Sequence, residues 1–292
     1  MAVNEIWTIG RILKWTEGYF AQKGIENPRL DAEVLLGHVL KKQRIYLYVH
    51  FDEPLQPAEL QSFREMIKQR INHVPVAYIL GEKEFMGLTF KVTKDTLVPR
   101  PDTEILVQGA VDRLRSSGRE HVCIADIGTG TGAVGLSVLH FFPGAELDTV
   151  DISGAARAVA EENAAHLELT DRVHFFTGDL LLPLQGQTYD AILSNPPYIP
   201  AADISKLSAD VQLSEPHTAL DGGEDGLDFY HRLCEHAPAM LVQGGFMAFE
   251  VGINQAQAVA ELAENNPLIE KTEILKDYAG IDRVVVAWKK EA

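Results

Sequence analysis

The sequence predicts an α/β protein, in which a doubly wound, mostly parallel sheet is preceded by a small helical domain. Three observations predict this fold class. From about residue 105 to the end, short apolar segments alternate with helical stretches, which is typical of a parallel sheet covered on both faces. A glycine-rich segment follows the first of these apolar segments. Residues 1–75 show only the apolar spacing of helices.

The first 75 residues are expected to form a bundle of helices. Asn27 and Pro28 are typical of a helix start, because Pro is tolerated at the first helical position, and Pro57 marks a second start. The apolar residues that follow recur at helical spacing: Leu30, Val34, Leu35, Val39, then Leu60, Phe63, Ile67, Ile71. No group of residues here is typical of catalysis, so we expect this domain to provide a docking surface for the substrate.

Residues 76–98 are expected to link the two domains as a β-hairpin, because Gly87 lies between β-prone segments. The catalytic domain is then expected to cover residues 99–292. It begins with Pro99-Arg-Pro-Asp-Thr-Glu104, where two prolines favour an extended chain and the polar residues after them favour a helix start. Helix capping alone would explain most of that segment.

The catalytic domain is expected to contain at least six strands. They are Val122–Ile127, Ala145–Asp151, Arg172–Thr177, Ala191–Ser194, Gly245–Glu250 and Arg283–Trp288. The stretch Ala155–Leu167 has helical character and separates the second strand from the third. We therefore expect the carboxyl ends of the first four strands to meet at one edge of the sheet, where open α/β sheets bind ligands.

Charge is unevenly distributed along the 292 residues, which carry a formal net charge of −16. Residues 1–80 hold 10 Lys and Arg against 9 Asp and Glu, whereas the remainder holds 16 against 33. Duplex nucleic acid normally needs a basic face on its protein partner. No direct nucleic acid partner is therefore expected.

Neither a membrane nor a metal is expected as a partner. No apolar run approaches membrane-spanning length, and the first residues lack a basic and apolar secretion signal. Cys123 and Cys234 do not have the spacing of metal ligands. These observations favour a reduced, cytoplasmic protein.

A candidate cofactor site begins with the glycine-rich segment Gly128-Thr129-Gly130-Thr131-Gly132. Glycines let the backbone adopt positive φ and let a ligand approach closely. The second strand ends in Asp151, whose carboxylate can accept hydrogen bonds from both hydroxyls of a ribose. Since the glycine spacing also satisfies the dinucleotide pattern, these residues alone allow either NAD or S-adenosylmethionine.

Two further strand ends favour S-adenosylmethionine. The third strand is followed by Asp179 and Leu180, which can accept a hydrogen bond from an adenine amino group and pack against the ring. The fourth is followed by Asn195-Pro196-Pro197-Tyr198, where two prolines end the strand in a rigid loop. The Asn195 and Pro196 carbonyls can accept both hydrogens of a planar NH2 group, and the Tyr198 ring can cover it.

The four strand ends together resemble those of the class I S-adenosylmethionine-dependent methyltransferases. With the segments Pro99–Glu104 and Glu215–Leu227, the chain over essentially its whole length resembles the peptide chain release factor glutamine methyltransferases of the PrmC/HemK family. The resemblance implies methylation of the glutamine amide in the Gly-Gly-Gln loop of bacterial class 1 release factors. It also implies that Arg100 and Glu104 lie beside the substrate loop. Some members carry an aromatic residue at the position of Leu180.

We therefore expect Asn195, Pro196 and Tyr198 to position the substrate amide for methyl transfer. The closest alternative is an N6-adenine methyltransferase acting on DNA or RNA, because such enzymes use the same Asn-Pro-Pro-Tyr loop on an exocyclic amine. The acidic balance and the absence of a basic, aromatic-interleaved stretch argue against it. An NAD-dependent oxidoreductase and a non-catalytic binding module are the remaining alternatives.

Overall fold

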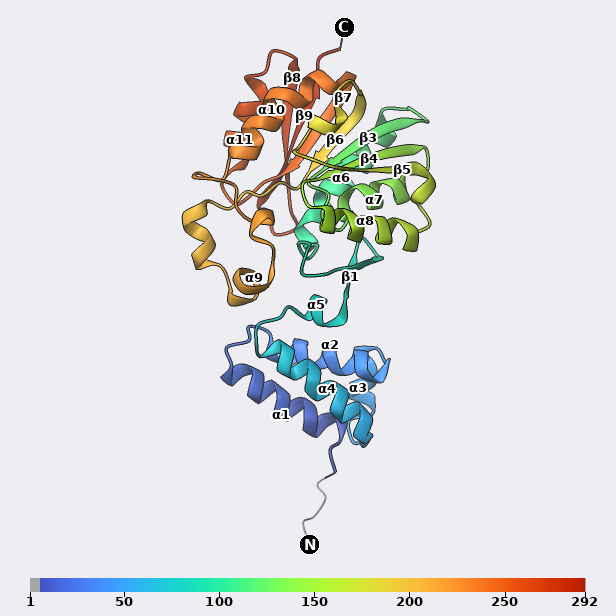
Figure 1. The fold of residues 1–292 in the computed structure, drawn as a ribbon, viewed down its shortest axis with the longest axis vertical. Coiled ribbons are helices and arrows are strands. Elements are labelled where there is room, and N and C mark those ends of the chain that lie inside the picture. The colour runs from blue at the N-terminus through green and yellow to red at the C-terminus, as the bar shows by residue number, and fades with distance from the viewer. Residues whose placement is uncertain (1–5, 292) are drawn as a thin grey trace. The chain divides into compact units, whose positions relative to one another are not determined.

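The computed structural model describes residues 6–291 and divides the chain into two compact units. Unit 1 comprises the residues up to Gly81 together with the segment Ser208–Ser214, and unit 2 comprises Glu82–Leu207 and the residues from Glu215 onward. Figure 1 traces the chain through both units. Ser208–Ser214 thus belongs to unit 1 although more than a hundred residues of sequence separate it from the rest of that unit.

Unit 1 is the helical domain that the sequence predicts. Its helices are α1 (Ile9–Gln22), α2 (Pro28–Leu40), α3 (Arg44–Val49), α4 (Pro57–Arg70), α5 (Val76–Leu80) and α9 (Ala209–Ser214). Pro28 and Pro57 open α2 and α4 as expected. The α4 start is capped by Gln56, whose backbone N–H donates to the Glu59 carboxylate at 2.7 Å. The core is made of apolar side chains at helical spacing, such as Phe20, Leu36 and Phe63.

The boundary between the units differs from the predicted one at residues 75 and 76. Helix α5 belongs to unit 1, because Val76, Ile79 and Leu80 pack against the helical core. The predicted hairpin forms, but it belongs to unit 2 as β1 (Glu82–Phe85) and β2 (Leu88–Lys91). Phe85 and Phe90 are fully buried in the unit 2 core, which explains why the hairpin is not a free linker.

Unit 2 is built on a seven-stranded sheet of order β5-β4-β3-β6-β7-β9-β8. The first five of these strands run parallel, and β9 and β8 are antiparallel to their neighbours. The strands are β3 (Val122–Ile127), β4 (Ala145–Asp151), β5 (Val173–Thr177), β6 (Tyr189–Ser194), β7 (Leu241–Glu250), β8 (Ile269–Lys276) and β9 (Asp282–Lys289). The six predicted strands are confirmed, while β8 was not anticipated because its exposed and buried residues do not form an apolar run.

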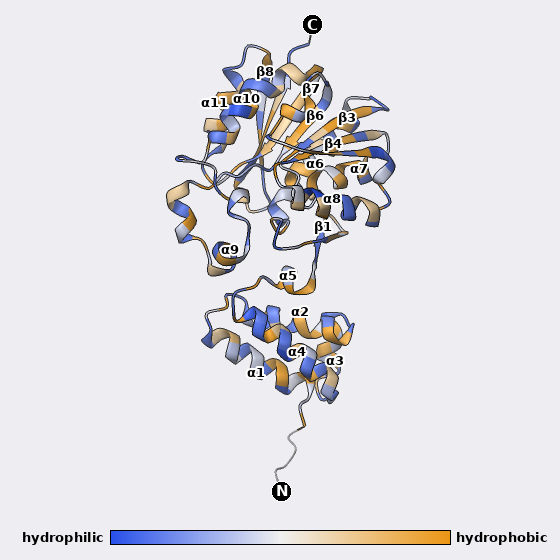
Figure 2. Cartoon of the chain, in the orientation of Figure 1, coloured by the Kyte–Doolittle hydropathy of each residue, from blue (hydrophilic) through white to orange (hydrophobic). Residues whose placement is uncertain are grey.

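Helices cover both faces of this sheet, as expected for a doubly wound fold. They are α6 (Glu104–Ser116), α7 (Ala133–Phe141), α8 (Gly154–His166), α10 (Asp228–Met240) and α11 (Ala256–Glu264). Helices α6, α7 and α8 contribute to the core on one face, and α10 and α11 to the core on the other. The central strands β3 and β6 are accordingly buried over most of their length, and Figure 2 shows much of the sheet in the colours of hydrophobic residues.

No helix within residues 6–291 has both the length and the apolar character needed to span a bilayer. The carboxyl ends of β3, β4, β5 and β6 lie at one edge of the sheet because these strands are parallel neighbours. This arrangement brings together the segments that follow the four strands, although they are spread over some seventy residues of sequence.

Candidate active site

A cavity of about 760 Å³ opens at this edge of the sheet, entirely within unit 2. Ligand sites are typically about 300–1,000 Å³ in volume. The cavity is lined by Gly128, Thr129, Gly130 and Thr131 of the glycine segment, by Asp151, Asp179 and Leu180, and by Asn195, Pro196, Pro197 and Arg100. The structure thus places eleven of the fourteen residues that the sequence singled out around one space, and leaves out Gly132, Glu104 and Tyr198.

The glycine segment turns from β3 into α7 through backbone conformations that favour glycine. Gly128, Gly130 and Gly132 have φ values of +73°, +55° and +82°. A Cβ built at Gly128 or Gly130 would meet nothing within 4 Å, whereas one at Gly132 would lie 2.7 Å from Leu136. The first two glycines therefore leave open space for a ligand, and the third allows close packing of α7.

The buried carboxylate of Asp126, near the end of β3, supports this loop through hydrogen bonds. It accepts hydrogen bonds from Thr129 Oγ1 at 2.7 Å and from the Gly135 backbone N–H at 3.0 Å. Burial raises the pKa of Asp126 to about 6, and both hydrogen bonds oppose that rise. Asp126 lies in β3, two residues before the glycine segment, and only these contacts show that it supports the loop.

Asp151 is fixed at the cavity wall by two backbone groups. Its Oδ2 accepts from the Gly130 N–H and its Oδ1 from the Ser153 N–H, each at 2.8 Å. Burial raises the pKa of Asp151, while these hydrogen bonds lower it. Each carboxylate oxygen keeps a lone pair, so the group can still accept hydrogen bonds from a diol.

The next strand end carries an ion pair that the sequence did not reveal. Asp179 Oδ2 lies 2.5 Å from a terminal guanidinium nitrogen of Arg232, which comes from α10 and also lines the cavity. Leu180 has a φ of +49°, an uncommon conformation for a residue other than glycine, and packs against the core beneath α10. Arg232 gave no sequence signal, because an isolated Arg on a helix is ordinarily a solvated surface residue.

The Asn-Pro-Pro-Tyr loop presents Asn195 to the cavity and turns Tyr198 away from it. Asn195 Nδ2 donates to Thr103 Oγ1 at 3.2 Å. Tyr198 packs against the core and its hydroxyl lies 3.4 Å from Glu250 Oε1. The Tyr198 backbone carbonyl accepts from Gln255 Nε2 at 2.9 Å, which anchors the loop to the start of α11. That the Tyr198 ring covers a substrate amide remains a prediction.

A second segment lies directly against this loop. The backbones of Ile199 and Gly222 are hydrogen-bonded at 2.9 Å, and Ile199 forms a parallel bridge with Asp221. A Cβ at Gly222 would lie 2.8 Å from Tyr198 Cα and 2.9 Å from the Pro197 carbonyl oxygen. Glycine is therefore required where the two backbones meet, and the segment around His217 and Asp221 closes one side of the cavity.

Each polar side chain of Arg100–Glu104 connects to a different part of unit 2. Arg100 pairs with the buried Glu215 at 2.6 Å and lines the cavity. Asp102 lies 3.3 Å from Arg283 of β9. Glu104 accepts from the Met86 backbone N–H at 2.8 Å in the hairpin turn and does not line the cavity. Thr103 contacts Asn195, a role that sequence reasoning missed.

Among residues 6–291, no three His, Cys, Asp or Glu side chains are grouped so as to hold a metal ion. The chemistry available at the cavity is that of oriented hydrogen-bond acceptors around an apolar space. Two carboxylates lie at the ends of β4 and β5, and an amide and backbone carbonyls at the end of β6. Such a set can position a ligand with a diol and an amino group next to a planar amide.

Comparisons with known proteins agree with this arrangement. The family model described as the PrmC N-terminal domain matches residues 11–81, and the model described as the methyltransferase small domain matches residues 103–223. The release factor glutamine methyltransferase of Moorella thermoacetica is 46% identical over 271 residues, which cover 93% of this chain and 95% of that protein. The Geobacter sulfurreducens protein of the same name is 43% identical over 281 residues, or 96% of each chain.

Solved structures agree on the fold. A methyltransferase from Pyrococcus furiosus matches with a TM-score of 0.53 at 19% identity, covering 71% of this chain and 92% of that one. The N-terminal domain of human METTL16 in complex with SAH matches with a TM-score of 0.51 at 17% identity, covering 70% of this chain and 77% of that one. Unit 2 thus has the class I methyltransferase fold.

Proposed function

The chain belongs to the release factor glutamine methyltransferase family, and we propose that it methylates the side-chain amide nitrogen, N5, of the glutamine in the Gly-Gly-Gln motif of bacterial class 1 release factors. It is an S-adenosylmethionine-dependent methyltransferase. The observation that carries the proposal is the single cavity that residues of the glycine segment and Asp151 line together with Asn195 and Pro196. Residues suited to a nucleoside and residues suited to an amide share one space.

The residues present suit S-adenosylmethionine. Open space beside Gly128 and Gly130 lets a ligand reach the backbone, and Asp151 keeps lone pairs for the two ribose hydroxyls. Asp179 can accept from the adenine amino group while it stays paired with Arg232, because a carboxylate has about four acceptor sites. Bound at this place, S-adenosylmethionine supplies a methyl group that its positively charged sulfur already activates.

The protein's own contribution is then mainly positioning. Asn195 Oδ1 and the Pro196 carbonyl accept the two hydrogens of the substrate amide, so that the face of its nitrogen is directed at the methyl group. An amide nitrogen is a weak nucleophile because its lone pair is delocalised into the carbonyl. No strong base is needed beforehand, since methyl transfer would leave a positively charged amide nitrogen that is very acidic and loses one of its hydrogens to water, while the cofactor leaves as the neutral thioether S-adenosylhomocysteine. Arg100 lines the cavity, which supports the proposal that it contacts the loop carrying the glutamine.

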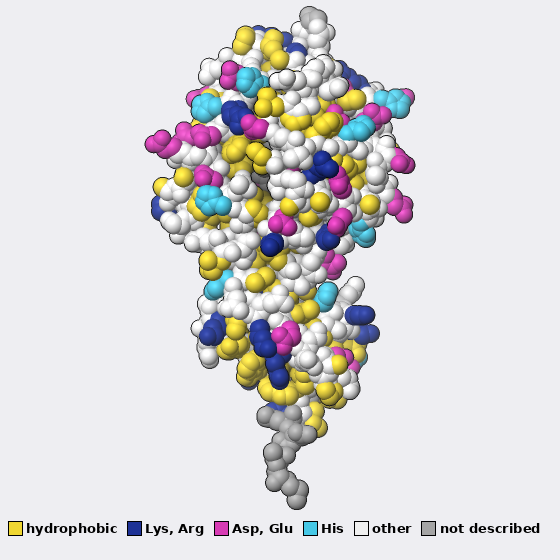
Figure 3. Space-filling model, viewed as in Figure 1, with side chains coloured by type: hydrophobic (Ala, Val, Ile, Leu, Met, Phe, Trp, Pro, Cys, Tyr) yellow, Lys and Arg dark blue, Asp and Glu magenta, His cyan; other side chains and the backbone are white. Residues whose placement is uncertain are grey.

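Two surface features support a protein partner. Unit 1 exposes large apolar side chains, including Trp15, Ile45 and Val49, the last two more than 60% accessible. Figure 3 shows hydrophobic and basic side chains next to one another on its visible face. The residues after position 80 are strongly acidic, which suits a partner with a basic surface. Since release factors act on ribosomes, the reaction would take place in the cytoplasm.

The direct test is methyl transfer to a purified release factor. The protein is incubated with S-adenosylmethionine labelled in its methyl group and a bacterial class 1 release factor, beside the Gly-Gly-Ala variant of that factor. We expect label on the first factor and none on the second. Label on both would place the modification elsewhere on the factor. Label on neither, together with label on DNA or RNA, would support the N6-adenine alternative instead.

A further inference from the structure

Gln255, at the start of α11, joins three separate segments of unit 2 through one side-chain amide. Its Nε2 donates to the Tyr198 carbonyl at 2.9 Å and lies 3.4 Å from the Gly226 carbonyl oxygen. Its Oε1 accepts from the Gly252 backbone N–H at 2.9 Å. The end of the Asn-Pro-Pro-Tyr loop, the segment before α10 and the turn after β7 therefore meet at a residue that the mechanism above does not use.

The backbone partners of Gln255 determine which way its amide faces. The Gly252 N–H can only donate, and the Tyr198 carbonyl can only accept. Oε1 must therefore face Gly252 and Nε2 must face Tyr198, although the two ends of an amide are nearly identical in shape. The Gln255 backbone N–H also donates to the Gly252 carbonyl at 3.1 Å, so its backbone and its side chain both hold the turn after β7. The amide thus has a fixed position from which it holds the loop.

Two glycines leave the room that this arrangement needs. Gly226 has a φ of +79°, and a Cβ there would lie 2.3 Å from the Tyr198 carbonyl oxygen and 2.6 Å from Gln255 Nε2. A Cβ at Gly252 would lie 2.6 Å from Gln255 Oε1. Both glycines therefore pack closely around the same amide group, and a larger residue at either position would displace it.

The contact with Gln255 fixes the far end of a rigid loop. Ser194, directly before Asn195, is the last residue of β6, and its hydroxyl donates to a backbone carbonyl of the neighbouring strand β3 at 2.7 Å. Between Ser194 and Tyr198, the two prolines have fixed φ angles, and each also restricts the residue before it. Few backbone rotations therefore remain once both ends of the loop are held, and the position of Asn195 depends on both anchors.

We propose that Gln255 is a positioning residue, which acts through the Tyr198 carbonyl to hold Asn195 and the Pro196 carbonyl in the geometry that the substrate amide requires. Gln255 does not line the cavity itself. The inference rests on the proposed function, because Asn195 and Pro196 are the groups proposed to accept the two amide hydrogens. Without the Gln255 contact the loop can rotate at Tyr198, and the two acceptors then no longer point at the same NH2 group.

The test compares Gln255→Met and Gln255→Glu with the wild-type enzyme acting on a release factor at pH 8. Gln255→Met replaces the amide with an unbranched apolar side chain of similar length. Gln255→Glu keeps the shape and the acceptor for Gly252, but it cannot donate to the Tyr198 carbonyl once ionised. We expect both variants to lower kcat by about 10- to 100-fold, the range for a misplaced reacting group. A wild-type kcat in Gln255→Glu would show that donation to Tyr198 does not position the loop, and the inference would be refuted.

A cofactor measurement and a matched control separate positioning from a general loss of stability. The affinity for S-adenosylmethionine, measured by calorimetry, should change by less than about threefold, because the ribose and adenine are proposed to be held by Asp151 and Asp179. Gln257 lies on the same helix, where its exposed side chain donates to Glu261 at 3.1 Å. Gln257→Met makes the same chemical change on the surface and should leave kcat within about twofold. An equal loss of kcat in Gln257→Met and Gln255→Met would refute the positioning role.

A readout without substrate keeps this inference separate from the proposed function. The Ile199 N–H donates to the Leu220 carbonyl at 3.0 Å, and the Gly222 N–H donates to the Ile199 carbonyl at 2.9 Å. These two amides report whether the chain directly after Tyr198 stays in place, because hydrogen exchange requires their hydrogen bonds to open. We expect their exchange, followed by NMR, to be about tenfold faster or more in Gln255→Met and unchanged in Gln257→Met.

The outcomes of the exchange experiment distinguish the two proposals. Unchanged exchange at Ile199 and Gly222 in Gln255→Met would overturn the inference even if the wild-type protein methylates release factor. Faster exchange in that variant, together with a wild-type protein that does not methylate release factor, would support the hold of Gln255 on the loop and overturn only the proposed function.

Discussion

At the scale of single residues, the active site divides into groups that hold the cofactor and groups that hold the substrate amide. Asp151 accepts a hydrogen bond from Gly130 of the glycine segment, whereas the Asn195 side chain donates to Thr103. The two side chains lie at the ends of different strands, β4 and β6. Because they share no partner, their substitution should affect different kinetic constants.

Asn195→Ala removes one of the two acceptors proposed for the substrate amide. We expect kcat to fall by about 100-fold or more, in line with the loss of one preorganised polar group at a reacting centre. Cofactor affinity should stay within about threefold, since the ribose and adenine are proposed to be held by Asp151 and Asp179 and not by the Asn195 amide. Steady-state kinetics with release factor, combined with calorimetry, measure both. Turnover within about tenfold of wild type, roughly 1.4 kcal/mol, would contradict the assignment.

Asp151→Asn is expected to weaken cofactor binding. The carboxylate lies between two backbone N–H groups at 2.8 Å, and it is the acceptor proposed for the ribose hydroxyls. Losing charge-assisted hydrogen bonds should raise the dissociation constant of S-adenosylmethionine by about 10- to 100-fold. At saturating cofactor, kcat should change little. A dissociation constant equal to that of the wild type would rule out the ribose role.

Glu250 also yields a prediction about stability. Its folded-state pKa of about 7 lies above that of an unfolded-state Glu, so the folded protein binds the extra proton between these values. Wild-type stability should therefore increase as pH falls from about 7 to about 4.5 through this group. Glu250→Gln removes the buried charge and should stabilise unit 2 by about 2 kcal/mol at pH 8, but hardly at pH 5. Thermal melts of both proteins at the two pH values test this, and a pH-independent difference would contradict it.

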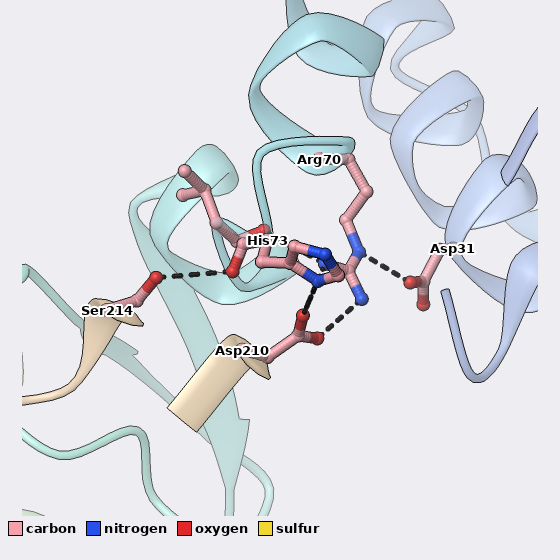
Figure 4. Close-up of polar contacts among 6 residues, drawn as sticks. Asp31, Arg70, His73, Asp210 and Ser214 are labelled. Carbon is pink, nitrogen blue, oxygen red and sulfur yellow. Dashed lines mark hydrogen bonds and ion pairs between the residues drawn. The ribbon is translucent and has the colours of Figure 1, made fainter. Parts of the chain in front are cut away.

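At the scale of elements, the segment after the Asn-Pro-Pro-Tyr loop is the least expected part of the fold. Ser208–Ser214 belongs to unit 1, where Arg70 of α4 joins it to α2 (Figure 4). Arg70 is 4% exposed and donates to Asp31 at 2.7 Å and to Asp210 at 2.5 and 3.0 Å. His73 Nδ1 also lies 3.0 Å from Asp210. These contacts anchor Ser208–Ser214 within unit 1. They therefore also fix one end of the stretch of chain that connects this segment to the Asn-Pro-Pro-Tyr loop.

Asp210→Asn is expected to release this segment. The variant leaves Arg70 paired with Asp31 but removes the charge of its second carboxylate partner, and weakening this charge-assisted contact of a largely buried Arg should destabilise unit 1 by about 1–3 kcal/mol. Proteolytic cleavage between residues 201 and 214 should become faster. The matched control is Asp203→Asn in the same stretch, which loses only a surface pair with Lys206, worth about 0–1 kcal/mol. Equal cleavage rates in both variants would show that Asp210 does not anchor the segment.

At the scale of the whole molecule, charge is divided between the two parts of the chain. Residues 1–80 are nearly neutral, while the remainder holds 33 acidic against 16 basic side chains. Long-range attraction to a basic partner acts mainly on the association rate and is screened by salt over about 8–10 Å. The rate at which the acidic catalytic unit associates with a release factor should therefore depend on ionic strength.

We expect kcat/KM for release factor to fall by several-fold, about 3- to 10-fold, when salt is raised from low to about 0.3 M. The value of kcat at saturating release factor should change much less, because the reacting groups are enclosed in the cavity. Steady-state assays over a salt series measure both. A kcat/KM that does not depend on salt would mean that recognition relies on apolar contacts such as those offered by Trp15 and Ile45.

The sequence by itself determined the features that local chemistry controls. Proline and glycine restrict the backbone directly, so the starts of α2 and α4, the glycine segment and the end of β6 could be located from single positions. Apolar residues concentrated in short segments located the six predicted strands, because strands in the middle of a covered parallel sheet are buried over most of their length. Strand order then brought the four strand ends together, and with them Asp151, Asp179 and Asn195.

Only the tertiary structure decided which side chains support these groups. Thr103 meets Asn195 across 92 positions of sequence, and Arg70 meets Asp210 across 140. Neither pairing leaves a local pattern, because each depends on how separate elements pack and not on the conformation of either segment. For the same reason Arg232 looks like an ordinary surface residue in the sequence. Its pairing with Asp179 exists only once α10 and the end of β5 have been brought to the same edge of the sheet.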